Sequence, residues 1–205
     1  MKKLFQKLKK RYELYVAVQK QRDNIRLVVG SGTGSRPADI LKNGWIFTDI
    51  YALNIIKEAD CKKTFQPNSI RAILAEHVWE HLTPEDGVLA IRNCFKYLKN
   101  GGYLRIAVPD GFHPDPNYIN YVKVGGTGAG AIRHKVLFTH QSLGASLTQS
   151  GFTIDLLEYF DENGIFHAQD WNPDDGKIIR SIRFDKRNED GLTNFTSLIV
   201  DAIKK

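Results

Sequence analysis

Hydrophobic and polar residues alternate along this chain in a pattern that predicts strands and helices in turn, from residue 25 to about residue 160. Short apolar runs between turn residues are typical of buried strands. The predicted strands lie near residues 26–30, 45–49, 52–55, 70–75 and 103–108. Because strands that alternate with helices favour a mostly parallel sheet with helices on both faces, the sequence predicts an α/β fold.

Helices are predicted between and after these strands, near residues 58–65, 85–98 and 140–150. The second helix has clear boundaries, since Thr83 and Pro84 form a good start and Gly101 accepts the left-handed geometry of a helix end. The loop 109–133 is rich in proline and glycine, and its length suggests a function. Further strands are predicted near 153–160, 165–168, 177–184 and 195–203.

The first 24 residues differ in charge from the rest of the chain. Residues 1–22 carry a net charge of +7, so the remaining residues sum to −1. Apolar residues recur there at helical spacing, with lysines on the other face. We therefore divide the chain into a basic amphipathic helix, 1–24, and a single domain, 25–205. The helix either packs on the domain as a lid over the cofactor loop or makes a peripheral contact with anionic lipid. A contact between this segment and nucleic acid is a third alternative, but no nucleic-acid partner is expected, because the domain itself is not basic.

The remaining composition is that of an ordinary intracellular chain. Cys61 and Cys94 stand far apart in no metal-binding pattern, as expected of reduced thiols. The basic N-terminus is not followed by the apolar core of a signal peptide, and no apolar run is long enough to cross a bilayer. We expect a cytoplasmic protein.

The segment 25–50 points to a nucleotide pocket. An apolar run ends in a loop with three alternate glycines, and a second apolar run ends at Asp49. The glycines are Gly30, Gly32 and Gly34. Glycine lets the backbone approach a ligand closely, and an acid after the next strand can accept hydrogen bonds from ribose hydroxyls. This combination predicts a pocket for a cofactor that contains adenosine.

The glycine spacing selects among such cofactors. Dinucleotide-binding proteins use G-x-G-x-x-G/A, but here Ser35 occupies the last position and Pro37 follows shortly after. A loop of this kind makes a poor cradle for phosphates. S-adenosylmethionine, which has none, fits the pattern better than NAD.

Four segments in order give the chain a family resemblance: VGSGTG at 29–34, WIFTDI at 45–50, ILAEHVWEHL at 73–82 and FKYLKNGGYLRIAVPD at 95–110. Together they resemble class I S-adenosylmethionine-dependent methyltransferases, especially small bacterial methyltransferase-domain proteins. The resemblance implies a Rossmann-like fold with a mostly parallel seven-stranded sheet and an antiparallel last strand. It also implies S-adenosylmethionine as cofactor and methyl transfer as activity.

The resemblance assigns cofactor-binding roles by position. The glycines at 30, 32 and 34 would form the floor beneath the cofactor, Asp49 would bind the ribose, and Asn54 would lie beside the adenine. Glu76 and His77 would lie at the sulfonium end. The chain departs from the family pattern at Val28, where an acid is common, and Glu76 could compensate for that acid electrostatically.

Methyl transfer to a hydroxyl or an amine needs a base, and histidine is the natural choice near neutral pH. The candidates are His77, His113 and His134, with Asp110 on the rim where open α/β sheets bind ligands. We expect a small-molecule or saccharide acceptor. Its identity and the oligomeric state are not predicted.

Two other functions compete with this interpretation. Residues 77–81 match H-x-x-E-H, the zinc motif of a peptidase class, in which His77 and His81 would hold zinc and Glu80 would act as base. The nearby Thr83-Pro84 leaves little room for the helix that this motif requires, so we expect no bound metal. Alternatively, the absence of an acid at Val28 is compatible with a non-catalytic cofactor-binding or partner protein.

Overall fold

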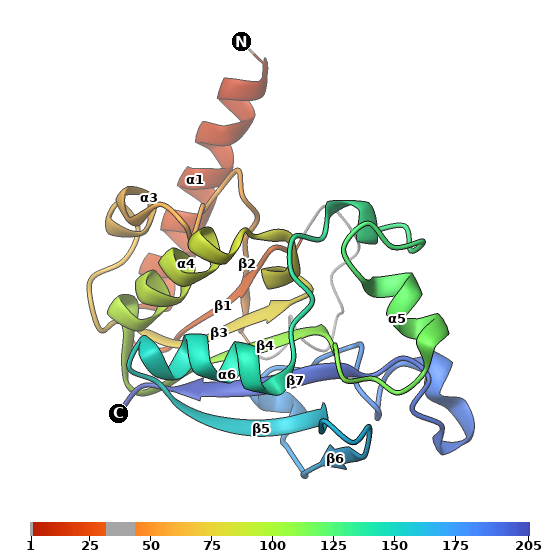
Figure 1. Ribbon diagram of the computed structural model, residues 1–205. Helices are drawn as coiled ribbons and strands as arrows, with labels where there is room; N and C mark the ends of the chain where they lie inside the picture. Colours follow the sequence, from red (N-terminus) through yellow and green to blue (C-terminus); the bar gives the residue numbers. More distant parts are fainter. Residues whose placement is uncertain (1, 32–43) are drawn as a thin grey trace.

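The computed structural model describes residues 2–31 and 44–205, which form one mixed sheet with helices packed against it (Figure 1). The sheet has seven strands among these residues, in the order β2-β1-β3-β4-β7-β5-β6. The strands are β1 (Ile25–Val29), β2 (Ile46–Phe47), β3 (Ile70–Glu76), β4 (Leu98–Pro109), β5 (Thr153–Phe160), β6 (Phe166–Ala168) and β7 (Ser197–Ile203). The first four run parallel, and β7 is antiparallel to both of its neighbours. The predicted α/β fold with an antiparallel last strand is confirmed.

The α-helices are α1 (Lys2–Lys20), α3 (Glu58–Lys62), α4 (Pro84–Tyr97), α5 (Pro116–Val122) and α6 (His140–Gln149). One-turn and two-turn 3-10 helices add η1 (Trp79–His81), η2 (Ala131–Arg133), η3 (Pro173–Asp175) and η4 (Lys186–Gly191). Helix α4 begins where the sequence predicts, because the Thr83 side chain accepts a hydrogen bond from the backbone N–H of Asp86.

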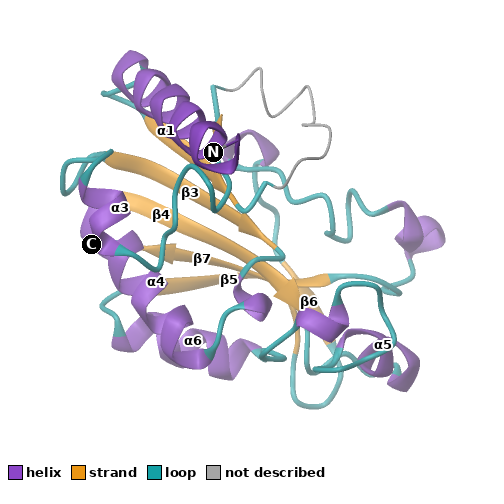
Figure 2. Cartoon of the chain, turned by 90° about the horizontal axis from the view of Figure 1, so that it is seen from above, coloured by secondary structure: helices purple, strands orange, loops and turns teal. Residues whose placement is uncertain are grey.

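The two faces of the sheet are covered differently. Helices α1, α3, α4 and α6 supply apolar side chains to one core layer, which includes Leu14, Ile91 and Leu143 (Figure 1). In the described part of the chain, the other face packs against an irregular segment that contributes Trp171 and Ile178. Figure 2 shows α5 and its flanking loops beyond the carboxyl ends of β3 and β4. A site at that edge is therefore built largely from loops.

Two predicted strands are wrong. Residues 52–55 form a turn, since the backbone carbonyl of Asp49 accepts hydrogen bonds from Ala52 and Leu53 and bends the chain at once. Residues 177–184 are also irregular, although their apolar alternation resembles a strand. The N–H groups of Ile179, Arg180 and Ile182 donate to the carboxylates of Glu76 and Glu158 instead of to a neighbouring strand. Side-chain acceptors of this kind leave no signal in a local sequence pattern.

Candidate functional site

The first glycine of the loop lies at the carboxyl end of β1 in a left-handed conformation. Gly30 has φ +69°, and a Cβ at this position would overlap the side chain of Val78. Glycine is therefore required here for two reasons, backbone conformation and close packing. Gly32 and Gly34 lie outside the described residues.

Asp49, directly after β2, is held in a fixed orientation. Its Oδ1 accepts hydrogen bonds from the backbone N–H groups of Tyr51 (2.9 Å) and Ala52 (3.2 Å), and its Oδ2 forms an ion pair with Lys10 of α1. Burial alone would raise the pKa of Asp49, but the hydrogen bonds from Lys10, Ala52 and Tyr51 outweigh it and lower the pKa. The carboxylate is therefore ionised, and it faces α1.

Two other predicted cofactor residues make local contacts. Asn54 accepts the backbone N–H of Ile56 at 3.0 Å, which fixes the turn that replaces the predicted third strand. Glu76, the last residue of β3, accepts the N–H groups of Ile179 and Arg180 at 3.2 and 2.8 Å. Glu76 therefore lies at the carboxyl end of β3, whereas Asn54 lies in a turn and not in the strand predicted over residues 52–55. Their cofactor contacts remain predictions.

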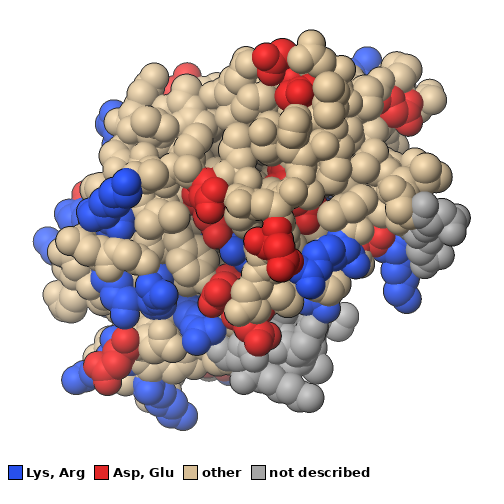
Figure 3. Space-filling model, turned by 90° about the horizontal axis from the view of Figure 1, so that it is seen from below, with Lys and Arg blue, Asp and Glu red and all other residues tan. Residues whose placement is uncertain are grey.

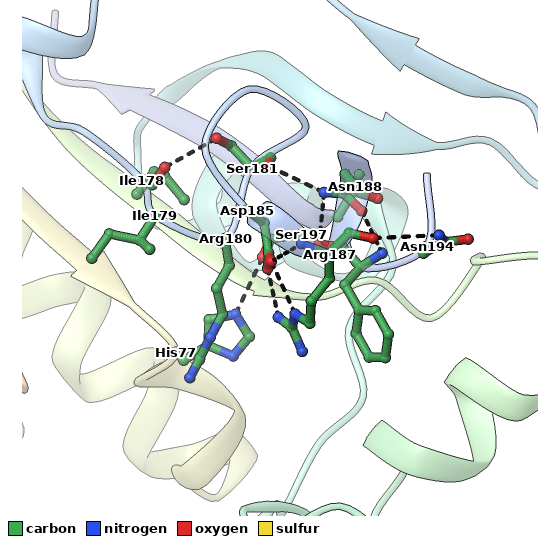
Figure 4. Close-up of polar contacts among 12 residues, drawn as sticks. His77, Ile178, Ile179, Arg180, Ser181, Asp185, Arg187, Asn188, Asn194 and Ser197 are labelled. Atoms are coloured by element: carbon green, nitrogen blue, oxygen red, sulfur yellow. Dashed lines mark hydrogen bonds and ion pairs between the residues drawn. The ribbon is translucent and has the colours of Figure 1, made fainter. Parts of the chain in front are cut away.

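His77 is the most constrained of the predicted residues. It follows β3 with φ +53°, a conformation that costs a non-glycine residue free energy and often marks functional sites. Its Nδ1 lies 2.9 Å from Oε1 of the buried Glu80. Its Nε2 lies 3.2 Å from the hydroxyl of Ser197, which Figure 4 shows beside it. The ring is thus oriented from both sides.

A cavity of about 200 Å³ opens beside His77. It lies between α5, the loop that contains η2, and the segment that leads into β7. Its polar and aromatic lining includes His77, Tyr118, Tyr121, His134, Arg180 and Arg187. In Figure 4, the side chains of His77, Arg180 and Arg187 extend to the same side of the sheet edge. Arg187 is held by Asp185 through a 2.9 Å bond from Nε. The cavity can accept a small polar molecule next to His77.

Asp110 and His113 lie outside this lining, in the loop that follows β4. Asp110 is fully buried and accepts the N–H groups of Phe112 and Phe160 at 2.9 and 2.7 Å. Burial raises its pKa to about 6 despite these bonds. His113 is stacked on Tyr118, and burial lowers its pKa. These contacts give both residues a structural task, while their catalytic roles remain predictions.

His134 does line the cavity, but it is also held by the backbone. Its Nδ1 is 2.7 Å from the carbonyl oxygen of Val122, and its ring meets that of His81 edge-on, with the ring centres 4.9 Å apart. The helix required for the zinc peptidase motif is not formed. His77 belongs to the end of β3, and only residues 79–81 make a short 3-10 turn.

The N-terminal helix is only partly packed. Leu14 and Val18 are buried against the sheet, whereas Leu4, Phe5 and Leu8 are 64%, 71% and 56% exposed. No helix of the described residues is long and apolar enough to span a membrane.

On the face shown in Figure 3, acidic and basic side chains are interspersed.

Several lining residues were not predicted. Arg180, Arg187 and Ser197 come from the last quarter of the chain, more than 100 residues after His77. Arg180 lies in the segment 177–184, which resembles a strand, and Arg187 lies just after it. This pattern does not distinguish a cavity wall from a solvated surface.

The comparison with known proteins identifies the fold of this chain but does not assign the chain to a sequence family. No protein-family model and no curated protein matches the chain. Among solved structures, it is similar to a SAM-dependent methyltransferase from Archaeoglobus fulgidus, with 18% identity over 95% of this chain and 94% of that one and a TM-score of 0.54. A SAM-dependent methyltransferase from Methanosarcina mazei shares 14% identity over 90% and 93% of the two chains, with a TM-score of 0.53.

A third similar structure is a SAM-dependent methyltransferase from Thermotoga maritima, named as a possible histamine N-methyltransferase. It shares 15% identity over 95% of this chain and 89% of its own, with a TM-score of 0.50. The chain therefore has the fold of class I methyltransferases, in agreement with the resemblance seen in its sequence.

Proposed function

We propose that this protein transfers a methyl group from S-adenosylmethionine to a hydroxyl or amine of a small molecule or saccharide held in the cavity beside His77. The observation that carries the proposal is the placement of His77. A histidine in a left-handed conformation at the end of β3 lies between a buried carboxylate and a cavity, at the sheet edge where this fold binds its ligands.

The residues present fit the cofactor. Gly30 leaves no room for a side chain at the start of the loop, and Asp49 is an ionised carboxylate with one oxygen bound only by a lysine. Such a carboxylate suits ribose hydroxyls. When bound, S-adenosylmethionine supplies an activated methyl group, so the protein has to position the acceptor and remove its proton.

The residues that line the cavity favour a polar acceptor. Tyr118, Tyr121 and Phe195 provide flat apolar surfaces, and Arg180 and Arg187 provide donors at the rim. Aromatic faces next to hydrogen-bond donors suit a sugar ring or another small polar compound. His77 would accept the acceptor's proton through Nε2, whose present partner is Ser197. The carboxylate of Glu80, 2.9 Å from Nδ1, would stabilise the charged ring.

The partly packed N-terminal helix is proposed as the region of any peripheral membrane contact.

Cys61 and Cys94 are buried and unbridged, which supports the proposed cytoplasmic location.

The proposal is tested with isotopically labelled S-adenosylmethionine and a panel of hydroxyl and amine acceptors, with labelled product as the measurement. We expect a product from the parent chain and a loss of about 100-fold or more in His77→Ala, the usual effect of removing a general base. Cofactor binding should persist in that variant. His167→Ala, at a partly exposed histidine of β6, is the matched control.

A chain that binds the cofactor but methylates no acceptor in the panel would favour the non-catalytic alternative. An unchanged rate in His77→Ala would contradict the assigned base and leave the cofactor assignment standing.

A further inference from the structure

Glu80 is the least satisfied charged residue among those that the structure describes. Its side chain is 1% exposed, and neither carboxylate oxygen accepts a well-aligned hydrogen bond from a described residue. The nearest nitrogen is His77 Nδ1, 2.9 Å from Oε1. A buried carboxylate is costly unless a cation or several donors compensate for it. This side chain therefore calls for a further positive partner.

Two histidines flank this carboxylate, and backbone carbonyls determine which ring nitrogen of each carries the proton. Nδ1 of His134 lies 2.7 Å from the carbonyl oxygen of Val122, and Nδ1 of His81 lies 3.3 Å from that of Arg133. A carbonyl can only accept, so it fixes the proton on Nδ1 and leaves the lone pair on Nε2. Metal-binding histidines are typically oriented by such a bond from the other nitrogen.

The three side chains also converge. One ligand atom from each of Glu80, His81 and His134 lies within 4.8 Å of the other two. Tetrahedral ligands of zinc, each at about 2.0–2.1 Å, are separated by about 3.4 Å, so small side-chain rotations suffice to close the site. The backbone holds the two segments together, since the N–H of Lys135 donates to the carbonyl oxygen of Glu80 at 2.6 Å.

We propose that Glu80, His81 and His134 bind one divalent transition-metal ion, with zinc as the best match to two imidazoles and a carboxylate. His134 also lines the cavity, so the ion lies in the wall of the acceptor site. Three protein ligands leave a coordination position for water or an acceptor oxygen. The ion also supplies the positive partner that Glu80 lacks.

This site differs from the zinc site that the H-x-x-E-H motif suggests. That site pairs His77 with His81, which are not on one helical face here. The sequence predicts no metal on that pair, because Thr83-Pro84 leaves little room for the helix that the motif requires. His134 lies 53 positions beyond His81 in the sequence, so the motif itself gives no sign of it.

The test is a zinc titration of the full chain after treatment with a chelator, in competition with a chromophoric chelator. We expect one equivalent of zinc per chain and at least a tenfold loss of affinity in His81→Ala and in His134→Ala. His167→Ala should bind as the parent does. Cobalt in place of zinc should give the visible absorption bands of a four- or five-coordinate site, and both ligand variants should lose them.

Thermal melting supplies a second measurement that does not depend on catalysis. Zinc should raise the melting temperature of the parent chain but not that of Glu80→Gln, which removes the buried charge and keeps the shape. If His134→Ala fails to fold, His81→Ala carries the test, because its ring is only partly buried.

Failure to bind stoichiometric zinc would overturn the proposal. The proposal would also be overturned if both His81→Ala and His134→Ala still bound zinc as the parent does. It would be overturned as well if His77→Ala lost zinc binding while His134→Ala retained it. None of these outcomes depends on methyl transfer, so the metal site and the proposed function stand or fall separately.

Discussion

Lys10 of α1 forms an ion pair with Asp49 at the carboxyl end of β2. The contact joins the basic N-terminal segment to the acid that the sequence assigns to the cofactor ribose. Because Oδ1 of Asp49 already accepts two backbone N–H groups, a ribose would reach the carboxylate mainly through Oδ2, the oxygen that Lys10 contacts. Helix α1 and the cofactor would therefore compete for one oxygen.

This competition predicts that Lys10→Ala binds S-adenosylmethionine more tightly than the parent chain. The Lys10 side chain is 38% exposed, so the ion pair contributes no more than about 0.5–1 kcal/mol and the gain should be about two- to fivefold. Titration calorimetry measures it, with Lys9→Ala as the control on a more exposed neighbour. Weaker binding in Lys10→Ala would mean that the lysine helps to hold the cofactor.

Asp49→Ala should weaken cofactor binding by about 1.5–3 kcal/mol, the range for hydrogen bonds to a charged group. The loss should exceed the gain from Lys10→Ala, and the double variant should resemble Asp49→Ala, since Lys10 then has no carboxylate to occupy. Asp60→Ala is the matched control, because it removes the ion pair between Asp60 and Arg11, the residue next to Lys10 on α1. It shows whether loosening α1 from the domain changes cofactor affinity by itself. Equal affinities in Asp49→Ala and the parent would remove the ribose assignment.

Asp110 predicts a pH dependence of stability. Its pKa is about 6 in the folded protein and near 3.8 when unfolded, so the folded state holds the proton more tightly. This contribution is fully present below about pH 4 and is lost as the pH rises through 6. Between pH 4 and 7 the free energy of unfolding of the parent should fall by up to about 3 kcal/mol more than that of Asp110→Asn.

Urea unfolding at both pH values measures this difference. Asp170→Asn, at a side chain that is 97% exposed, should follow the parent chain. Parallel pH profiles for the parent and Asp110→Asn would show that this carboxyl group is not shifted.

How far the sequence predicts the structure depends on where the determining contacts lie. Strands β1, β3 and β5 and helices α4 and α6 follow from local apolar spacing and caps, and they match within a few residues. The strand predicted over residues 177–184 is wrong because N–H groups of this segment bond to glutamates about 100 and 24 positions earlier. Spacing along a chain contains no information about such partners.

The site shows the same division. The positions of Asp49 and His77 could be predicted, because each comes within two residues of the end of an apolar strand and the carboxyl ends of parallel strands share one edge. Their roles remain predictions. The positions of Arg180 and Arg187 could not be predicted, since they lie in the irregular segment and the 3-10 helix η4 that precede β7. Ser197 begins β7, and nothing in the local sequence indicates that this end of the strand lines a cavity. Asp110 and His113 have the residue types of catalytic groups, and both hold the loop after β4 in place: Asp110 bonds to Phe112, and His113 bonds to Asp115 and to the distant Thr193. Their catalytic roles remain predictions.

The exposed half of α1 predicts the outcome of a membrane-binding assay. Leu4, Phe5 and Leu8 are exposed beside several lysines, a combination that suits anionic lipid. Sedimentation with phosphatidylserine vesicles should capture the parent chain, and the Phe5→Ser/Leu8→Ser variant should lose most of that binding. Neutral vesicles serve as the control. Equal sedimentation of both proteins would leave α1 as a lid alone.

The central claim, that the residues after β1 and β2 bind S-adenosylmethionine, is tested most directly by calorimetric titration of the parent chain with S-adenosylhomocysteine and, in parallel, with NAD. We predict a micromolar dissociation constant for S-adenosylhomocysteine, or about −8 kcal/mol, and far weaker binding of NAD. NAD binding tighter than S-adenosylhomocysteine binding would contradict the cofactor assignment, and with it the proposed methyl transfer.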